Sequence, residues 1–123
     1  MGAPLSADDL ISGCEKFTTA TARAHELMTV VSGKYDPAHR EFRVGASRAV
    51  LAILLHAAAL GGIRMQEVWM WLADPDAARE QIQRFLQCST EPRYTFNSLL
   101  HLYGPPTVRE ATLTPLKDAL GQR

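Results

Sequence analysis

An apolar run near the middle of the chain, residues 49–60, most constrains what this sequence can fold into. It reads AVLAILLHAAAL and is followed at once by Gly61 and Gly62. Alanine and leucine favour helix, and a helix that is apolar on every side has to be covered on every side. The run has about 12 residues, whereas a membrane span needs roughly 20. We therefore predict a helix that crosses the core of a bundle rather than a membrane anchor.

The length and composition describe one folded domain without a strong charge. The chain has 123 residues, 46% of them hydrophobic, and 13 basic and 13 acidic side chains that cancel. A nucleic-acid-binding domain is usually basic, so the zero balance is poor evidence for one, although a local basic patch is compatible with it. The two cysteines, Cys14 and Cys88, have neither the spacing of a zinc site nor that of a disulfide framework. With no signal peptide visible at the N-terminus, we expect reduced thiols in a cytoplasmic protein.

Helix start signals recur along the chain. The stretches DP at 36–37, DP at 74–75 and STEP at 89–92 each place a capping side chain before a proline that suits a first helical turn. Together with apolar residues at helical spacing, they predict a short helical turn before Gly13 and helices over residues 17–31, 37–60, 65–73, 75–87, 92–103 and 107–120.

The predicted fold class is all-α, a compact bundle of five to seven helices with short loops, because no alternating strand pattern longer than three residues is present. We expect Pro115 to kink or split the last helix. In the helix at 92–103, an α-helical period turns Leu99, Leu100 and Tyr103 inward, with Phe96 one turn earlier. His56, within the apolar run, is expected to be a hydrogen-bonded core residue rather than a ligand.

Motifs for catalysis and for cofactor binding are missing. The phosphate-loop pattern G-x-x-x-x-G-K-[ST] does not occur, since Gly33-Lys34 is followed by Tyr35 and has no glycine at the required position upstream. His25-Glu26 begins like a zinc-protease helix, but Thr29 occupies the place of the second histidine. We therefore expect no enzyme activity, metal or cofactor in this piece of chain.

Arginines and one tryptophan are the candidate contact residues. Ten of the 13 basic residues are arginine, which binds phosphate and carboxylate groups in a bidentate manner. The alternative is an ordinary solvated surface with ion pairs such as Glu80 with Arg84. Trp69 and Trp71 point to different faces of one helix, so one packs inward and the other is a second helix contact or an exposed anchor. The candidates for contact with cargo or DNA are Arg40, Arg43, Arg48, Arg64, Arg79, Arg84, Arg93 and Trp71.

Two stretches carry a family resemblance. The first is ISGCE at 11–15 leading into RAHEL at 23–27, and the second is 42–72, with LLHAAALGG at 54–62 and VWMWL at 68–72. They resemble the helical insertion domain of actinobacterial type IV secretion coupling proteins, which are hexameric ATPases that bring DNA or protein substrates to a secretion or conjugation channel. The resemblance implies that residues 1–123 are a single helical domain of a larger coupling ATPase whose nucleotide-binding domain is not included.

The resemblance also implies a partner. In that family the helical domain lies on the membrane-distal, cytoplasmic end of the hexamer, at the cytoplasmic face of the inner membrane, and receives substrate. Protein cargo, namely a relaxase, an accessory protein or an effector, is the first expectation, because salt-dependent phosphate binding needs clustered Lys or Arg. A DNA-binding domain that guides the transferred strand is the alternative, and a free-standing regulatory helical protein is the third. We expect the isolated domain to be a monomer.

Overall fold

Helices make up most of the described chain, and no residue in it lies in a strand. A computed structural model describes residues 7–32 and 37–120, with side chains for 9–30, 44–92 and 96–120. The predicted all-α fold is confirmed. In chain order the elements are the 3₁₀ helix η1 (Ala7–Leu10), the α-helices α1 (Phe17–Ser32), α2 (Pro37–Gly61), α3 (Met65–Ala73) and α4 (Pro75–Leu86), the 3₁₀ helix η2 (Arg93–Leu102) and the α-helix α5 (Pro106–Leu120).

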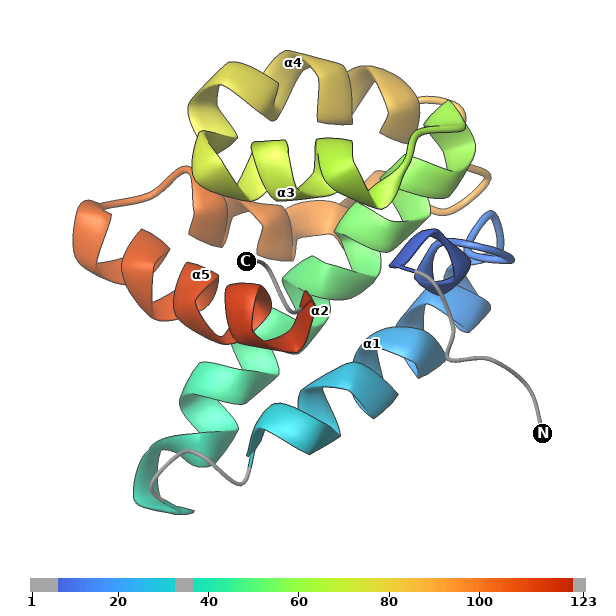
Figure 1. Cartoon of the computed structure of the whole chain (residues 1–123). Helices are drawn as coiled ribbons and strands as arrows, with labels where there is room; N and C mark the ends of the chain where they lie inside the picture. The colour runs from blue at the N-terminus through green and yellow to red at the C-terminus, as the bar shows by residue number, and fades with distance from the viewer. Residues whose placement is uncertain (1–6, 33–36, 121–123) are drawn as a thin grey trace, which may run out of the picture.

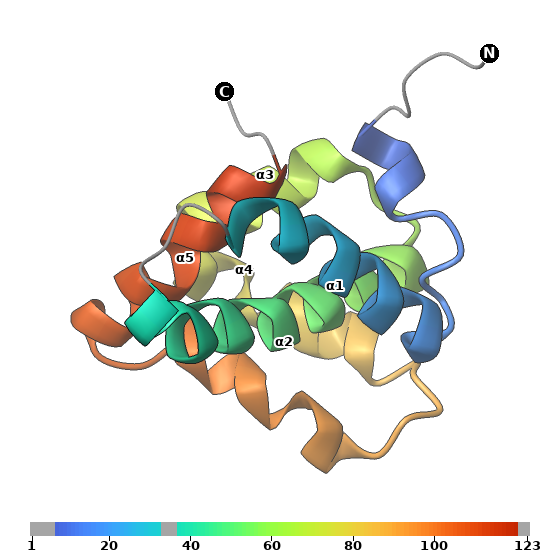
Figure 2. The ribbon, with the colours of Figure 1, turned by 90° about the horizontal axis from the view of Figure 1, so that it is seen from below.

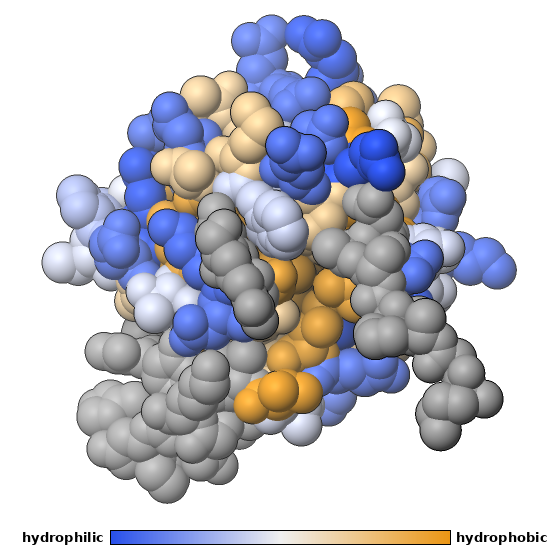
Figure 3. Space-filling model, viewed as in Figure 1, coloured by the Kyte–Doolittle hydropathy of each residue, from blue (hydrophilic) through white to orange (hydrophobic). Residues whose placement is uncertain are grey.

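Helix α2 is the centre of the bundle. It packs against α1, α4, α5 and η2, and every residue from 50 to 58 is buried. Figures 1 and 2 show α2 running through the molecule with α1 along one side and α5 along another, while α3 and α4 lie together at one end. At the surface, Figure 3 shows a strip of apolar atoms between α5 and α1. The apolar run therefore forms the core, as its composition predicts.

The apolar part of α2 is longer than the sequence run indicates. Val44–Gly61, which is 18 residues, has the length and composition of a helix that could cross a membrane. In the fold, 61% of this stretch is buried inside the protein. A helix that other helices surround has the same composition as one that lipid surrounds, so the burial identifies it as the core helix of this domain.

The start of α4 and the end of α2 follow the predicted local signals. The start predicted at 89–92 is wrong in its detail, because Pro92 itself precedes η2 and no side chain caps that helix, while Asp36 of the predicted start at 36–37 lies outside the described residues. The carboxylate of Asp74 accepts a hydrogen bond from the backbone N–H of Ala77 at 3.2 Å, and Pro75 occupies the first helical position of α4. At the start of α3, the backbone N–H of Arg64 donates to the Glu67 carboxylate at 3.0 Å. Gly62, with a φ of 67°, ends α2 in the left-handed region that glycine adopts without strain.

The segment predicted as an α-helix over 92–103 is a 3₁₀ helix, and this changes which side chains face the core. A 3₁₀ helix has three residues per turn, so residues three apart lie directly above one another. Leu99 and Leu102 are therefore buried, with Phe96 half-buried in the same row. Leu100 is 62% exposed. The predicted inward position of Leu100 is wrong, because that prediction used the α-helical period of 3.6 residues.

Pro115 does not divide α5, which continues from Pro106 to Leu120. Of the two predicted outcomes, a split of the helix is therefore wrong, and a kink stays a prediction. Proline removes one backbone donor and disturbs the turn before it. In that turn the hydroxyl of the buried Ser47, from α2, donates to the backbone carbonyl of Thr112 at 2.8 Å. The carbonyl that Pro115 leaves without its helical donor is that of Ala111, one residue earlier, so the Ser47 hydrogen bond is an additional link between α2 and α5.

The end of α2 lies so close to α4 that a side chain at Gly61 would displace the ring of Phe85. A Cβ atom on Gly61 would lie 2.5, 2.6 and 2.7 Å from three ring carbons of Phe85. We expect Gly61→Ala to lower the free energy of unfolding by about 1–3 kcal/mol, because the Phe85 ring has to move. Gly45→Ala is the matched control, since Gly45 lies in the same helix with nothing within 4 Å of its Cβ position. It should keep or raise the stability, by up to about 1 kcal/mol. An equal loss in both variants, measured by urea denaturation, would contradict this steric explanation.

Candidate functional site

The predicted contact arginines lie in separate surroundings. Arg48 is half-buried between α2 and α1, where its Nη1 is 3.3 Å from Nδ1 of His25. Arg64 is exposed at the start of α3. The remaining two whose side chains are described, Arg79 and Arg84, are both on α4. The side chains of the other three predicted residues, Arg40, Arg43 and Arg93, lie outside the described ones.

The charges of α4 are arranged in pairs, with one exception. Arg84 Nη2 lies 3.2 Å from Glu80 Oε1, which confirms the predicted ion pair. Both of these side chains are strongly exposed, so the pair contributes at most about 0.5 kcal/mol. Asp76, in the first turn of α4, is 3.1 Å from Nη2 of Arg109 on α5. Arg79 instead lies over the ring of Tyr103, with its guanidinium carbon 4.7 Å from the ring centroid.

Trp71 is a core residue, which corrects its assignment as a candidate contact. Its side chain is 4% exposed, its Nε1 donates to Oε1 of Gln81 at 2.9 Å, and its ring centroid lies 6.3 Å from that of Phe85. Trp69, two residues earlier, is half-buried. Trp71 lies on the face of α3 that also buries Met65, Val68 and Leu72. It therefore fills the space between α3 and α4 and presents no anchor to a partner.

His56 is hydrogen-bonded in the core, as predicted. Its Nδ1 lies 2.8 Å from the carbonyl oxygen of Cys14, and its Nε2 lies 2.7 Å from the hydroxyl of Ser89. Because a carbonyl only accepts, Nδ1 of the ring donates to it, and Nε2 is left to pair with the Ser89 hydroxyl. The Ser89 oxygen in turn accepts from the backbone N–H of Glu91 at 3.0 Å. This chain of hydrogen bonds joins α2 to the loops that precede α1 and η2.

The surroundings of His56 are those of a structural residue. The rings of Phe17 and Phe96 lie 5.3 and 6.0 Å from its ring, centroid to centroid. Its partner in Cys14 is the carbonyl, while the buried Cys14 thiol is directed to the carbonyl of Leu10 at 3.4 Å. Burial raises the pKa of the Cys14 thiol, and the neighbouring Arg23 only partly offsets this. A buried thiol with a raised pKa is a poor nucleophile, so the cluster does not form a cysteine–histidine pair.

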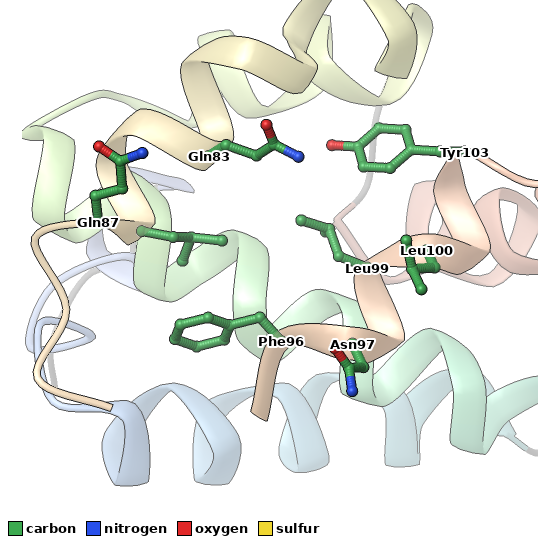
Figure 4. A pocket seen from close by; sticks show the side chains of 8 residues that line it. Gln83, Gln87, Phe96, Asn97, Leu99, Leu100 and Tyr103 are labelled. Atoms are coloured by element: carbon green, nitrogen blue, oxygen red, sulfur yellow. The ribbon is translucent and has the colours of Figure 1, made fainter. Parts of the chain in front are cut away.

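A cleft of about 360 Å³ lies between α4 and η2. Figure 4 shows Gln83 and Tyr103 pointing toward one another from opposite walls, with Leu99 between them and Phe96 deeper along the cleft. Apolar side chains are thus at its base and amides are along its edges. The lining residues are Gln83, Leu86, Gln87, Phe96, Asn97, Leu99, Leu100 and Tyr103.

Each wall of the cleft is a row of side chains set by its helix type. On α4, residues four apart share a face, which aligns Arg79, Gln83 and Gln87. On η2, the three-residue period aligns Asn97 and Leu100 with Tyr103, which follows the last residue of the helix. The other row of η2, Phe96, Leu99 and Leu102, packs against the core. It thereby holds η2 in the position where its outer row faces α4.

Tyr103 lies at one end of the cleft, with its hydroxyl oxygen closed off from solvent. The Tyr103 hydroxyl is buried and has no hydrogen-bond partner among the described residues. Burial raises the pKa of Tyr103 to about 12, an effect that Arg79 opposes and Asp76 reinforces. The phenol therefore keeps its proton and remains a donor at any physiological pH. In the described part of the chain no carboxylate pairs with Arg79, so one positive charge is left at this end.

A second recess lies between η1 and α1 and has a volume of about 660 Å³. Arg23 lines it, but its guanidinium is already engaged in the fold. Nη1 of Arg23 already donates to the backbone carbonyls of Asp9, at 2.9 Å, and Leu10, at 2.8 Å. This guanidinium therefore holds η1 against α1. We take the α4–η2 cleft as the candidate functional site.

Sequence reasoning missed this cleft, apart from Arg79 at its end. Gln83, Gln87 and Asn97 are ordinary surface residues when each is considered alone. The available signal was the spacing of Phe96, Leu99 and Leu102, three residues apart twice in succession, which matches a 3₁₀ period better than an α-helical one.

We next asked whether the described residues form a metal site or whether the chain resembles a known protein. Among the described residues, no group of three His, Cys, Asp or Glu side chains is placed to hold a metal ion. Comparison of the chain with family models, with curated proteins and with solved structures finds no match.

Proposed function

We propose that this domain recognises a segment of a partner protein, as the cargo-receiving domain of a type IV secretion or conjugation coupling ATPase. The observation that carries the proposal is the α4–η2 cleft. Its base is apolar, and its edges carry primary amides, which both donate and accept hydrogen bonds. Such a surface matches the side chains and backbone of a peptide.

The resemblance of residues 11–27 and 42–72 to the helical domain of coupling proteins supplies the biological setting of this proposal. In that setting the cargo is a relaxase, an accessory protein or an effector, and the ATPase activity belongs to a separate nucleotide-binding domain. The domain itself acts by binding, as a monomeric unit of a hexameric parent at the cytoplasmic face of the membrane.

Charge favours protein over DNA as the ligand. The net charge is zero, and among the described arginines Arg84 is paired with Glu80 and Arg109 with Asp76. A protein that binds DNA through phosphates needs several unpaired cations on one surface. The alternative role, guidance of a DNA strand, would depend on Arg40, Arg43, Arg48 and Arg64.

The test compares two ligands. We expect the purified domain to bind a relaxase or effector that is encoded beside its parent gene, measured by isothermal calorimetry. We expect little binding to single- or double-stranded DNA, even at low salt. Micromolar DNA binding that falls steeply as salt rises, together with no binding to the protein cargo, would replace this proposal with the DNA-guiding role.

A further inference from the structure

We infer that the α4–η2 cleft binds an extended segment of the cargo through its backbone and through one uncharged, apolar side chain of about the size of leucine. The inference rests on the proposed cargo-receiving function and specifies the chemistry of its ligand. Three observations carry it, namely a lining without charge, unpaired amides along both edges of the cleft, and the spacing of two of those amides along α4.

The base of the cleft accepts an apolar side chain. Leu86 and Leu99 are buried, with 9% and 5% of their surfaces exposed, and the half-buried Phe96 continues this apolar surface. The volume of about 360 Å³ is near the lower end of the range for ligand sites, about 300–1,000 Å³, so a few residues fill it. Insertion of one apolar side chain between the two leucines removes its surface from water, which favours binding.

The lining selects against a charged side chain at the inserted position. Among the described residues that line the cleft, none carries a charge. The nearby charges of α4 have other contacts, because Arg84 is paired with Glu80. Arg79 stacks on the ring of Tyr103 and is not part of the lining. A carboxylate or ammonium group that entered the cleft would therefore lose water without gaining a counter-charge.

Unpaired amides are available along both edges of the cleft. The side chains of Gln83, Gln87 and Asn97 are exposed, and none of them has a hydrogen-bond partner among the described residues. Gln81, on the same helix, is instead used by the fold, since its Oε1 accepts from Nε1 of Trp71 at 2.9 Å. Gln83 points across the cleft in Figure 4, and exposed side chains such as Gln87 and Asn97 rotate rapidly to meet a ligand. Each amide both donates to a peptide carbonyl and accepts from a peptide N–H.

The spacing of Gln83 and Gln87 matches an extended chain. Residues four apart on an α-helix are about 6 Å apart along its axis, at 1.5 Å per residue. In an extended chain, backbone groups that point to the same side recur every second residue, about 6.6 Å apart. The two glutamines can therefore pair with one side of an extended segment, and Asn97 with the other side. A helical segment has already used these backbone groups internally.

An extended segment also separates the inserted side chain from its neighbours. Successive side chains point to opposite faces of such a chain, so the residues before and after the inserted one point to solvent. The cleft should consequently reject a charge at the inserted position and tolerate the same charge one residue away.

The experiment uses pentapeptides with blocked ends and nuclear magnetic resonance titration of the ¹⁵N-labelled domain. The probe SSLSS should shift the side-chain amide signals of Gln83, Gln87 and Asn97. SSASS should bind at least about five-fold more weakly, because less apolar surface is buried. SSDSS and SSKSS should bind at least about ten-fold more weakly than SSLSS. SDLSS, which carries its charge on the neighbouring residue, should bind within about two-fold of SSLSS.

Matched variants test the role of the amides. Gln83→Ala and Asn97→Ala, on opposite edges, should each weaken SSLSS binding by about two- to ten-fold, because each removes a hydrogen bond to the peptide backbone. Gln66→Ala is the control, since Gln66 is an exposed glutamine on α3 that does not line the cleft. It should leave SSLSS binding unchanged.

A modified peptide tests recognition of the backbone. An SSLSS analogue with N-methyl groups on the leucine and on the serine that follows it lacks two backbone donors. It should bind more weakly than SSLSS, because an extended ligand uses these N–H groups to pair with the edges of the cleft.

The outcomes distinguish failure of the inference from failure of the proposed function. Equal binding of SSLSS, SSASS and SSDSS overturns the inference, as does equal SSLSS binding by the Gln83→Ala and Gln66→Ala variants. Undiminished binding of the N-methylated analogue overturns the extended ligand. Shifts of the same amide signals with domain concentration alone would assign the cleft to a second copy of the chain and overturn the inference.

Binding of the cargo protein decides what remains. Absence of peptide binding while the cargo protein still binds the domain overturns the inference and leaves the proposed function. Absence of binding to both peptides and cargo overturns both.

Discussion

Replacing His56 by alanine is expected to lower the free energy of unfolding by about 2–4 kcal/mol. The change leaves a cavity in the centre of the bundle and removes the partners of the Cys14 carbonyl and the Ser89 hydroxyl. The carbonyl of the buried Cys14 then lacks this partner, whereas the part-buried Ser89 oxygen still accepts from the backbone N–H of Glu91. Urea denaturation followed by circular dichroism measures the loss.

Two further histidine variants make this result specific. His56→Gln keeps a polar side chain and should cost less than the alanine change. His101→Ala is the control, since His101 is exposed on η2 and surface substitutions typically change stability by no more than about 0.5 kcal/mol. Equal effects of His56→Ala and His101→Ala would show that the hydrogen-bonded cluster does not stabilise the fold.

Two leucines of η2, two residues apart, are expected to respond very differently to the same truncation. Leu102→Ala should lower the free energy of unfolding by about 2–5 kcal/mol, because its side chain is 1% exposed. Leu100→Ala should change it by no more than about 0.5 kcal/mol, because its side chain is 62% exposed. The pair is measured by the same denaturation experiment.

This comparison also tests the helix type. An α-helical segment with Leu99, Leu100 and Tyr103 turned inward predicts the reverse order, with the larger loss for Leu100→Ala. A loss for Leu100→Ala that equals or exceeds that for Leu102→Ala would therefore contradict the 3₁₀ register, and with it the row of residues that forms one wall of the cleft.

The helices that the sequence predicted well are those whose ends are set locally. Asp74 and Pro75 fix the start of α4 through contacts within four residues, and Gly62 ends α2 by its own backbone preference. The central position of α2 follows equally directly, because a helix with Val50–Ala58 apolar almost throughout has no polar face to turn to water. Helix ends set by local capping, and burial set by composition, can be predicted without knowing which other helices pack nearby.

The cleft was not predictable in the same way, because it belongs to two segments at once. Gln83 and Tyr103 are 20 positions apart in the chain, and neither has a sequence pattern that indicates the other. The burial of Trp71 depended likewise on α4, which supplies Phe85 and Gln81. Such positions are decided by packing between elements, which a single sequence does not record.

Because η2 is a 3₁₀ helix of ten residues, we expect it to open locally more easily than the α-helix on the other side of the cleft. A 3₁₀ helix longer than three or four residues is uncommon, since its hydrogen bonds are poorer than those of an α-helix. Backbone amides of η2 should therefore exchange with solvent through local opening, while those of α2 exchange only when the whole domain unfolds. A ligand that does not fit the cleft at rest would be accommodated by rearrangement of η2 against an α4 that stays in place.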